Sequence, residues 1–486
     1  MPPPATRAED AAAAADSPHP HHLAEQLPPI SFESNPSNEA AQADGREAGG
    51  SVTEKEGTLS ACGEIAAGEA KQVDEEKAVP PAPGLYDYPD GGWRAWSVVA
   101  GAWCVSFTSW GLTNAFGVFQ SYYQEHQLSE FSHSDISWIG SLQLALVLAC
   151  AILVGKAFDA GYIKYLLTIA ACLWALGMFG LSGASQYYQV FLAQGLTCGL
   201  AAGVAFIPAA SSVSHWFKKR RATALGILAT GSSFGGIIYP VLLNHLFPKI
   251  GFGWTVRAAA FLTFGMVCVA ALTVNSRLPP RKIERIFDFS PLREKSFLIL
   301  VIGETLIMWG LYTPYFYIQD YALSYGISSN LALYSLSILN AASIFGRVIP
   351  NWLADTYGPL TILTPQCFIS GILIFLFLPM CKSTVGLIFF TILFGFSSGA
   401  YVSMMPATVA SLTNDMRQVG HRTATMFLIV SVAALTGTPI SGAIISRSNG
   451  SYVGAFVCAG CFVMVGSCFN AAAWWVVSRE KGTRWV

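Results

Sequence analysis

The chain has 486 residues, of which 53% are hydrophobic and only 12% are charged. Ordinary soluble domains are about 25% charged, so this composition excludes a typical soluble protein and indicates one that lies in a membrane. The net charge of −1 hides two unlike parts, because 17 of the 29 acidic residues precede residue 91.

Residues 1–90 form the first predicted segment. They are rich in Ala, Pro, Ser, Gly and Glu and lack the apolar content that would offset the entropy cost of ordering. They have no basic start followed by an apolar stretch, so we do not expect a cleaved secretory signal. We predict a disordered cytoplasmic tail over 1–90.

Twelve later segments are long and apolar enough to cross a bilayer, which takes about 20 helical residues. Lipid offers no partner to open backbone groups, and these segments are too uniformly apolar for barrel strands, so we expect an all-α membrane protein. The approximate limits are 95–120, 135–158, 163–184, 187–213, 222–245, 254–275, 296–320, 331–353, 360–380, 384–412, 423–446 and 452–478.

Basic residues are distributed unequally among the connections. The even-numbered connections and the segment after the last span carry 17 Lys and Arg, whereas the odd-numbered connections carry only Lys249, Lys382 and Arg447. Because cytoplasmic loops are enriched in Lys and Arg, both termini are predicted to be cytoplasmic. We interpret the basic run at 218–221 as a cytoplasmic anchor rather than a nucleic-acid patch.

The two halves of the chain repeat at an offset of 196 to 201 residues. Trp110-Gly111-Leu112 recurs as Trp309-Gly310-Leu311, Gln120 as Gln319, Pro208 as Pro406 and Asp159 as Asp355. We therefore predict six-helix halves at 91–275 and 296–478, a cytoplasmic linker at 276–295 and a cytoplasmic tail at 479–486. Two parallel six-span halves are the major facilitator architecture, in which the substrate site lies between the halves.

Asp159 and Asp355 stand at the predicted inner ends of spans two and eight. The stretch "GKAFDAGYIK" at 155–164 resembles the major facilitator loop after span two, although Ala160 stands where a basic residue usually follows the Asp. An Asp at this place can accept hydrogen bonds from a helix N-terminus in one conformation and release them in another. We predict that both are gating residues, with solvated loop acids as the alternative.

Two motifs carry a closer resemblance. "PDGGWRAW" at 89–96 resembles the Asp-Gly-Gly-Trp signature of the monocarboxylate porter family, and "WFKKRRATALGILATGSSFGG" at 216–236 resembles its second signature. The resemblance covers about residues 86–478 and implies a secondary transporter of monocarboxylates or related compounds. The signature residues are Asp90, Gly91, Gly92, Trp93, Lys218, Lys219, Arg220, Arg221, Gly226, Gly231 and Gly235. Independently of the resemblance, the glycines of span five indicate close helix packing, whether static or sliding.

An ionisable residue inside a predicted span is costly and by default a functional candidate, and two such residues stand out. Arg347 in span eight matches the arginine that, in the resembled family, binds the substrate carboxylate, and a guanidinium can hold a carboxylate through two hydrogen bonds. Glu304 in span seven lies at a similar depth. We predict an ion pair between them, with Glu304 as the proton-coupling residue; a static pair that fixes helix register is the alternative.

Polar residues in spans usually face the protein interior, so we predict that Asn114, Asn340, Tyr312 and Tyr315 line the substrate site. For the tyrosines, ordinary packing is equally compatible with the sequence. Aligned on the first signature, Asn114 replaces a lysine and Ser343 replaces an acid that proton-coupled animal members carry. Simple proton symport of lactate-like substrates is therefore not expected.

The long tail and these replacements resemble the fungal branch of the family, whose members include permeases and exporters of organic acids or carboxylated secondary metabolites. We expect a secondary transporter of the plasma membrane that works as an exporter, with the vacuolar membrane as the alternative location. The alternative functions are a transporter-like sensor and an importer of a non-carboxylate nutrient.

Enzymatic activity is not expected, because the sequence has no clustered His and no nucleotide-binding glycine loop. We predict no cofactor and no metal, and the pair Cys458 and Cys461 is interpreted as helix packing. The expected partners are a small-molecule substrate, a co-transported proton and the lipid bilayer. Neither nucleic acid nor an obligate protein partner is predicted.

Overall fold

The computed structural model describes residues 89–277, 289–413 and 419–485. They belong to one compact unit that spans 81–486. The described residues are almost entirely helical and contain no strand, which confirms the all-α prediction. The predicted tail lies outside the described residues except for Pro89 and Asp90.

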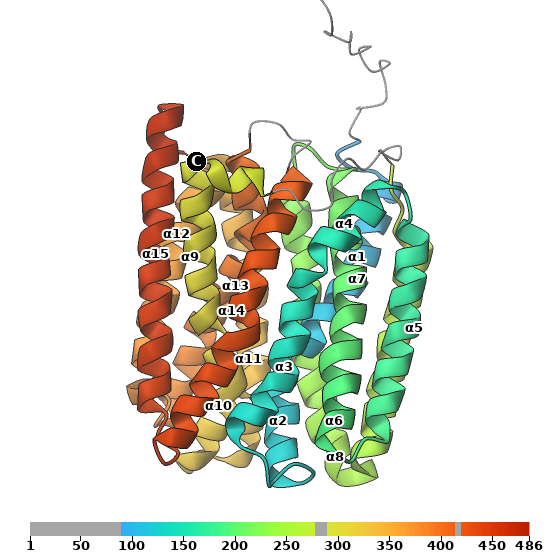
Figure 1. Ribbon diagram of the computed structural model, residues 1–486, viewed down its shortest axis with the longest axis vertical. Coiled ribbons are helices and arrows are strands. Elements are labelled where there is room, and N and C mark those ends of the chain that lie inside the picture. Colours follow the sequence, from blue (N-terminus) through green and yellow to red (C-terminus); the bar gives the residue numbers. More distant parts are fainter. Residues whose placement is uncertain (1–88, 278–288, 414–418, 486) are drawn as a thin grey trace, which may run out of the picture. The chain divides into compact units, whose positions relative to one another are not determined.

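The first half contains α1 to α8, which lie together on one side of Figure 1. Gly251 divides α8 into two helices, because its φ of 74° and ψ of 173° are not helical, and glycine adopts such angles at little cost. The bounds are α1 (Trp93–Asn114), α2 (Phe116–Glu125), α3 (His133–Ala149), α4 (Ala151–Asp159), α5 (Ile163–Ser182), α6 (Tyr187–Val190), a π-helix (Phe191–Cys198), α7 (Gly199–Ser214) and α8 (Arg221–Thr273).

The second half contains α9 to α15, on the other side of Figure 1. A short 3₁₀ helix (Ser290–Arg293) precedes α9 (Lys295–Leu311), and the remaining helices are α10 (Thr313–Ser324), α11 (Ser329–Tyr357), α12 (Pro359–Met380), α13 (Thr384–Ser411), α14 (Val419–Arg447) and α15 (Val453–Lys481). The last helix continues to Lys481, so the first residues of the predicted tail at 479–486 are helical.

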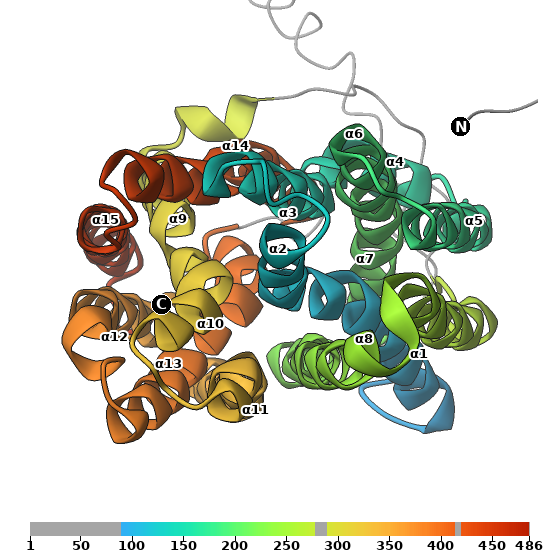
Figure 2. The ribbon, with the colours of Figure 1, turned by 90° about the horizontal axis from the view of Figure 1, so that it is seen from below.

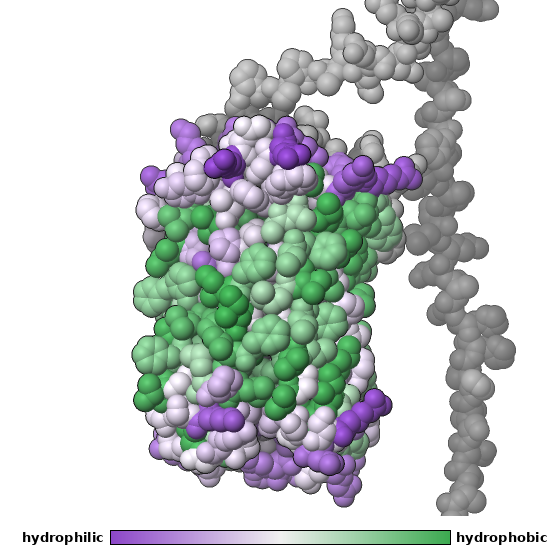
Figure 3. Space-filling view, turned by 90° about the vertical axis from the view of Figure 1, so that its left-hand side faces the viewer, coloured by the Kyte–Doolittle hydropathy of each residue, from purple (hydrophilic) through white to green (hydrophobic). Residues whose placement is uncertain are grey.

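The helices account for the predicted spans. Ten continuous helical stretches are long and apolar enough to cross a membrane. One of them, Arg221–Thr273, holds two spans across Gly251, and α1 with its continuation α2 supplies the remaining one. The described residues thus contain helices for all twelve predicted spans. In Figure 3 apolar residues cover the middle of the visible face and polar residues both ends, as a bilayer requires.

The first span of each half is broken shortly after its Trp-Gly-Leu motif. α1 gives way to α2 at Ala115, and α9 gives way to α10 at Tyr312. Pro314 lacks a backbone N–H, which explains the second break, since it cannot continue the hydrogen-bond ladder of α9. α2 and α10 pack against each other between the two halves (Figure 2).

The signature glycines of α8 lie where other helices approach closely. A Cβ at Gly231 or Gly235 would collide with the backbone of α1, and one at Gly226 would lie 2.9 Å from the carbonyl oxygen of Arg347 in α11. α8 therefore packs closely on its own half and also on the other half, as the glycine pattern predicts.

Candidate substrate cavity

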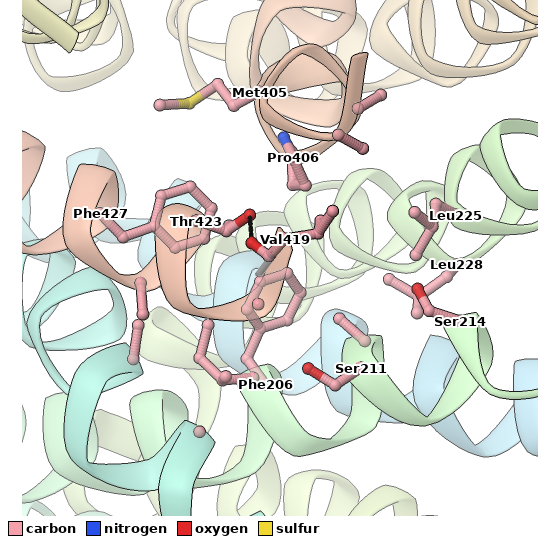
Figure 4. Close-up of a pocket in the computed structure, with 18 of the residues that line it drawn as sticks. Phe206, Ser211, Ser214, Leu225, Leu228, Met405, Pro406, Val419, Thr423 and Phe427 are labelled. Carbon is pink, nitrogen blue, oxygen red and sulfur yellow. Dashed lines mark hydrogen bonds between the residues drawn. The ribbon is translucent and has the colours of Figure 1, made fainter. Parts of the chain in front are cut away.

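A cavity of about 720 Å³ lies between the halves. Figure 4 shows side chains of α7 and α8 and side chains of α13 and α14 around this shared space. Its walls include Lys156, Lys218 and Arg221, so the cavity reaches the end of the molecule that carries the basic loops, the upper end in Figure 1. Pockets of about 300–1,000 Å³ are typical of small-molecule sites.

The cavity walls combine apolar surface with an excess of positive charge. Large apolar side chains come from both halves and include Trp110, Phe206, Met308, Met405 and Phe427. The charged wall residues are the basic Lys156, Lys218, Arg221 and Arg347 and the acidic Asp159 and Asp355. Such walls suit a molecule with an apolar body and an anionic group.

Arg347 lies on the cavity wall, as its predicted substrate-binding role requires. The residue is only 3% exposed, and its Nε is buried without a hydrogen-bond partner. Within the described part of the chain its guanidinium makes no ion pair with an acid. Because an unpaired buried guanidinium is costly, an anion in the cavity would be stabilised by it.

Glu304 does not reach the cavity, and the predicted ion pair with Arg347 is wrong for this conformation. Its Oε1 accepts a hydrogen bond of 3.0 Å from Nδ2 of Asn470 in α15, and the Tyr401 hydroxyl of α13 donates to its backbone carbonyl at 3.0 Å. Glu304 faces the interior of the second half, whereas Arg347 faces the space between the halves.

Asn114, Asn340, Tyr312 and Tyr315 are absent from the cavity walls that the described residues form, which corrects their predicted role in this conformation. Asn114 Nδ2 donates to Asn340 Oδ1 at 3.4 Å, a contact between the halves. The two tyrosines are buried beside Arg347, and Tyr315 hydrogen-bonds Ser398 at 3.0 Å.

Ser343, which stands in place of the family's acid, also joins the halves. Its hydroxyl lies 2.6 Å from that of Ser233 in α8. Two positions where the resembled family carries charged coupling residues thus hold neutral side chains that hydrogen-bond across the interface.

Further hydrogen bonds between the halves lie beyond these contacts. Ser137 of α3 meets the Tyr317 hydroxyl at 2.7 Å, and Ser134 donates to the carbonyl of Pro439 at 3.1 Å. Ser121 of α2 hydrogen-bonds Asp320 of α10. Sequence reasoning missed Asp320; the available signal was an acid inside an apolar span, one residue after the repeated Gln319.

Asp355 accepts hydrogen bonds from a helix N-terminus, the kind of contact that the gating prediction describes. Its carboxylate accepts hydrogen bonds from the backbone N–H of Thr223 at 3.3 Å and from the Thr223 hydroxyl at 2.8 Å. Thr223 lies in the first turn of α8, so an acid of the second half binds a helix N-terminus of the first. Asp159 shares the cavity wall with Gly420 and His421 of α14.

The two signatures contact each other. Asp90 Oδ1 accepts hydrogen bonds from the backbone N–H groups of Lys218 at 2.6 Å and Lys219 at 2.8 Å, while its own N–H donates to the Trp216 carbonyl at 3.1 Å. Desolvation by itself would raise the pKa of Asp90, but hydrogen bonds from the backbone of 218–220 and the charge of Lys219 bring it below its usual value. Gly92, at φ 85°, then turns the chain into α1.

The second half has a contact of the same kind. Glu294, immediately before α9, forms an ion pair with Arg422 in the first turns of α14. In each half, an acid just before the first span (α1 or α9) therefore binds residues at the start of the fifth span (α8 or α14). The contact made by the first signature is thus one of two such contacts between helix starts at the basic end.

Known membrane transporters are similar to this chain in sequence. The sequence profile of the Major Facilitator Superfamily matches residues 98–415. The "MFS-type transporter 1" of Ophiocordyceps sp. is 39% identical over 383 residues, 78% of this chain and 85% of that protein. The Aspyridones efflux protein apdF of Emericella nidulans is 37% identical over 379 residues, covering 78% of this chain and 77% of that protein. The Fujikurins efflux protein of Gibberella fujikuroi is 37% identical over 383 residues, covering 78% and 82%.

Solved structures resemble the fold. A POT family transporter in complex with 5-aminolevulinic acid matches with a TM-score of 0.63 at 14% identity, covering 80% of this chain and 99% of that one. The peptide transporter POT in complex with sulfate matches with a TM-score of 0.62 at 14% identity, covering 81% and 98%. At this identity the likeness concerns the fold alone.

Proposed function

Because the chain belongs to the Major Facilitator Superfamily, we propose that it exports an organic acid or a carboxylated secondary metabolite across the plasma membrane. It is a multi-pass membrane transporter and not an enzyme. Two of its relatives are named as efflux proteins, one for aspyridones and one for fujikurins, which supports export. The resemblance of residues 89–96 and 216–236 to the monocarboxylate porter signatures supports an acidic substrate.

Arg347 is the observation that carries this proposal. A carboxylate in the cavity would accept charge-assisted hydrogen bonds from the guanidinium, which lacks an acidic partner among the described residues. The apolar walls around Trp110, Phe206 and Phe427 would cover the remainder of the molecule. Tyr312 and Tyr315, packed beside Arg347, hold it in place and come closer to the substrate when the halves move.

The contacts between the halves suggest how access alternates. We place the basic end, and both chain termini, in the cytoplasm because of the Lys and Arg bias. The cavity then loads from the cytoplasm, and release on the other side requires that contacts such as Asn114–Asn340 and Ser233–Ser343 break. The Thr223–Asp355 contact, together with Asp159, forms the inner gate in this proposal.

Glu304 remains our candidate for proton coupling, although by another route than direct exchange with the substrate. Its Oε2 and the Oδ1 of Asn470 are both buried without partners, while the other atoms of the two groups are already hydrogen-bonded. A proton on Glu304 would let the acid and the amide pair through two hydrogen bonds. Protonation would therefore act on the packing of α9 against α15.

The test compares metabolites inside and outside cells of the source organism that lack or overexpress the protein. We expect one acidic compound to accumulate inside the deletion strain and to return to the medium when the wild-type protein, but not the Arg347→Ala variant, is restored. An Arg257→Gln variant is the matched control, because Arg257 contacts Ser182 and Trp254 away from the cavity. Depletion inside the deletion strain, with the compound left in the medium, would show import instead.

A further inference from the structure

Asp320 and Ser121 are equivalent positions of the internal repeat that meet across the two halves. They are 199 residues apart, as are Trp110 and Trp309. Helices α2 and α10, which carry them, pack against each other at the end of the molecule opposite the basic loops (Figure 2). The rings of Phe116 and Phe316 lie 5.0 Å apart in the same interface. At this nearly symmetric contact one half presents a hydroxyl and the other a carboxyl.

The carboxyl of Asp320 lacks the partners that a charge needs. Its Oδ1 is hydrogen-bonded to Ser121, but its Oδ2 is buried without a partner. No Lys, Arg or His in the described ranges forms an ion pair with it. Glu125 of α2 carries a like charge and repels the carboxylate of Asp320. The other titratable neighbours of Asp320 are Tyr317, on the same helix, and Tyr452, just before α15. Asp320 is partly buried, and a carboxylate with one oxygen buried in these surroundings would be costly.

The hydrogen atoms available at this contact indicate where a proton fits. The Ser121 hydroxyl carries one hydrogen but lies within hydrogen-bonding distance of two acceptors, the Gly117 carbonyl at 3.2 Å and Asp320. If Asp320 is an acid, it donates to Ser121, and Ser121 donates to Gly117. Each of these hydrogen atoms then has an acceptor, and no charge is left uncompensated; Oδ2 still lacks a partner but is then a neutral carbonyl oxygen.

We propose that Asp320 is a proton-binding site that closes the outer gate. When α2 and α10 separate, the carboxyl meets the external water; a proton from that water converts the carboxylate to the acid, and the acid permits the two helices to close. On reopening the proton returns to the same water. External acid thus favours the state that loads from the cytoplasm, an assignment of sides that rests on the proposed function.

Hydrogen–deuterium exchange of the purified full-length protein in lipid nanodiscs tests this site with protons as the only ligand. Exchange of segments 116–125 and 313–324 would be followed by mass spectrometry between pH 5.5 and 8, with segment 163–182 as the reference for the chemical pH dependence. In the wild type we expect the corrected exchange of both gate segments to rise severalfold toward pH 8. In Asp320→Asn, whose amide is neutral and can still donate to Ser121, exchange should stay low at every pH.

Two further variants make the result specific. Glu130→Gln, which removes an exposed acid of the loop after α2, should keep the wild-type pH profile. Ser121→Ala should raise exchange of both segments at pH 5.5, because the acid loses its partner. The proposal would be overturned if the corrected exchange of the wild type did not change with pH, or if Asp320→Asn showed the same pH dependence of exchange as the wild type. No substrate is present in the exchange experiment, so its result does not depend on whether the export experiment succeeds. The result of the export experiment likewise does not depend on the exchange experiment.

Discussion

The carboxylate of Asp90 binds the backbone of Lys218 and Lys219, at 2.6 and 2.8 Å, and so joins the entry of the first span to the entry of the fifth. The fifth span, the first part of α8, also carries Thr223, which binds Asp355 of the other half. One helix start therefore receives two carboxylates, one from its own half and one from across the cavity. The first signature therefore holds the start of α8 in the position that the proposed inner gate requires.

Replacing Asp90 by Ala should destabilise the folded protein by about 1 kcal/mol, the usual net value of a hydrogen bond near solvent. Because the pKa of Asp90 lies below its ordinary value of 3.8 in the fold, its contribution is complete above that pH and is lost as the pH falls through the lowered pKa. Thermal unfolding in detergent between pH 3 and 7 measures it. Glu130→Gln, an exposed loop acid, is the control and should match the wild type.

Replacing Arg347 by Ala should reduce export of the identified compound by about 10- to 100-fold, which corresponds to about 1.5–3 kcal/mol for hydrogen bonds to a charged group. Lys at this position should restore only part of the rate, because it cannot bind a carboxylate through a planar pair of hydrogen bonds. Initial export rates, normalised to the amount of protein in the membrane, provide the measurement. Export by Arg347→Ala at the wild-type rate would contradict the proposed site.

Replacing Asp355 by Asn should slow transport while the protein still folds. The amide is a weaker acceptor for the Thr223 backbone and hydroxyl than the carboxylate, and it does not interact with the positive end of the α8 dipole. We expect a severalfold lower export rate with a melting temperature within a few degrees of the wild type, since about 1 kcal/mol is lost. Thr223→Ser keeps both donors and should transport normally; equal impairment of the two variants would argue against this gate.

Replacing Glu304 by Gln should be tolerated, whereas Ala should not. The glutamine amide can accept from Asn470 Nδ2 and donate to Asn470 Oδ1, which has no partner now. Alanine leaves a cavity and an unpaired amide, which costs about 2–5 kcal/mol. Unfolding followed by size-exclusion fluorescence would rank the three proteins. A glutamine variant as unstable as the alanine variant would show that Glu304 is charged in the fold.

Intramembrane polar residues show where prediction from the sequence stops. Arg347, predicted at the substrate site, lines the cavity, whereas Glu304, predicted at a similar depth, faces Asn470 inside the second half. An α-helix has about 3.6 residues per turn, so residues at nearly the same depth can point to different sides of the helix. A predicted depth therefore does not tell which neighbour a side chain faces. Asn114 and Asn340 were assigned to the substrate site from polarity alone, but polarity also suits a contact between the halves.

The spans, their duplication and the family resemblance can all be predicted from the sequence. These properties depend on the length and hydropathy of local segments and on repeated motifs such as Trp110-Gly111-Leu112 and Trp309-Gly310-Leu311, which need no knowledge of packing. The contacts of Asp90 with the start of α8 and of Asp320 with Ser121, in contrast, depend on how the helices pack. Both contacts join residues more than a hundred positions apart, and the docking of one helix surface on another brings them together.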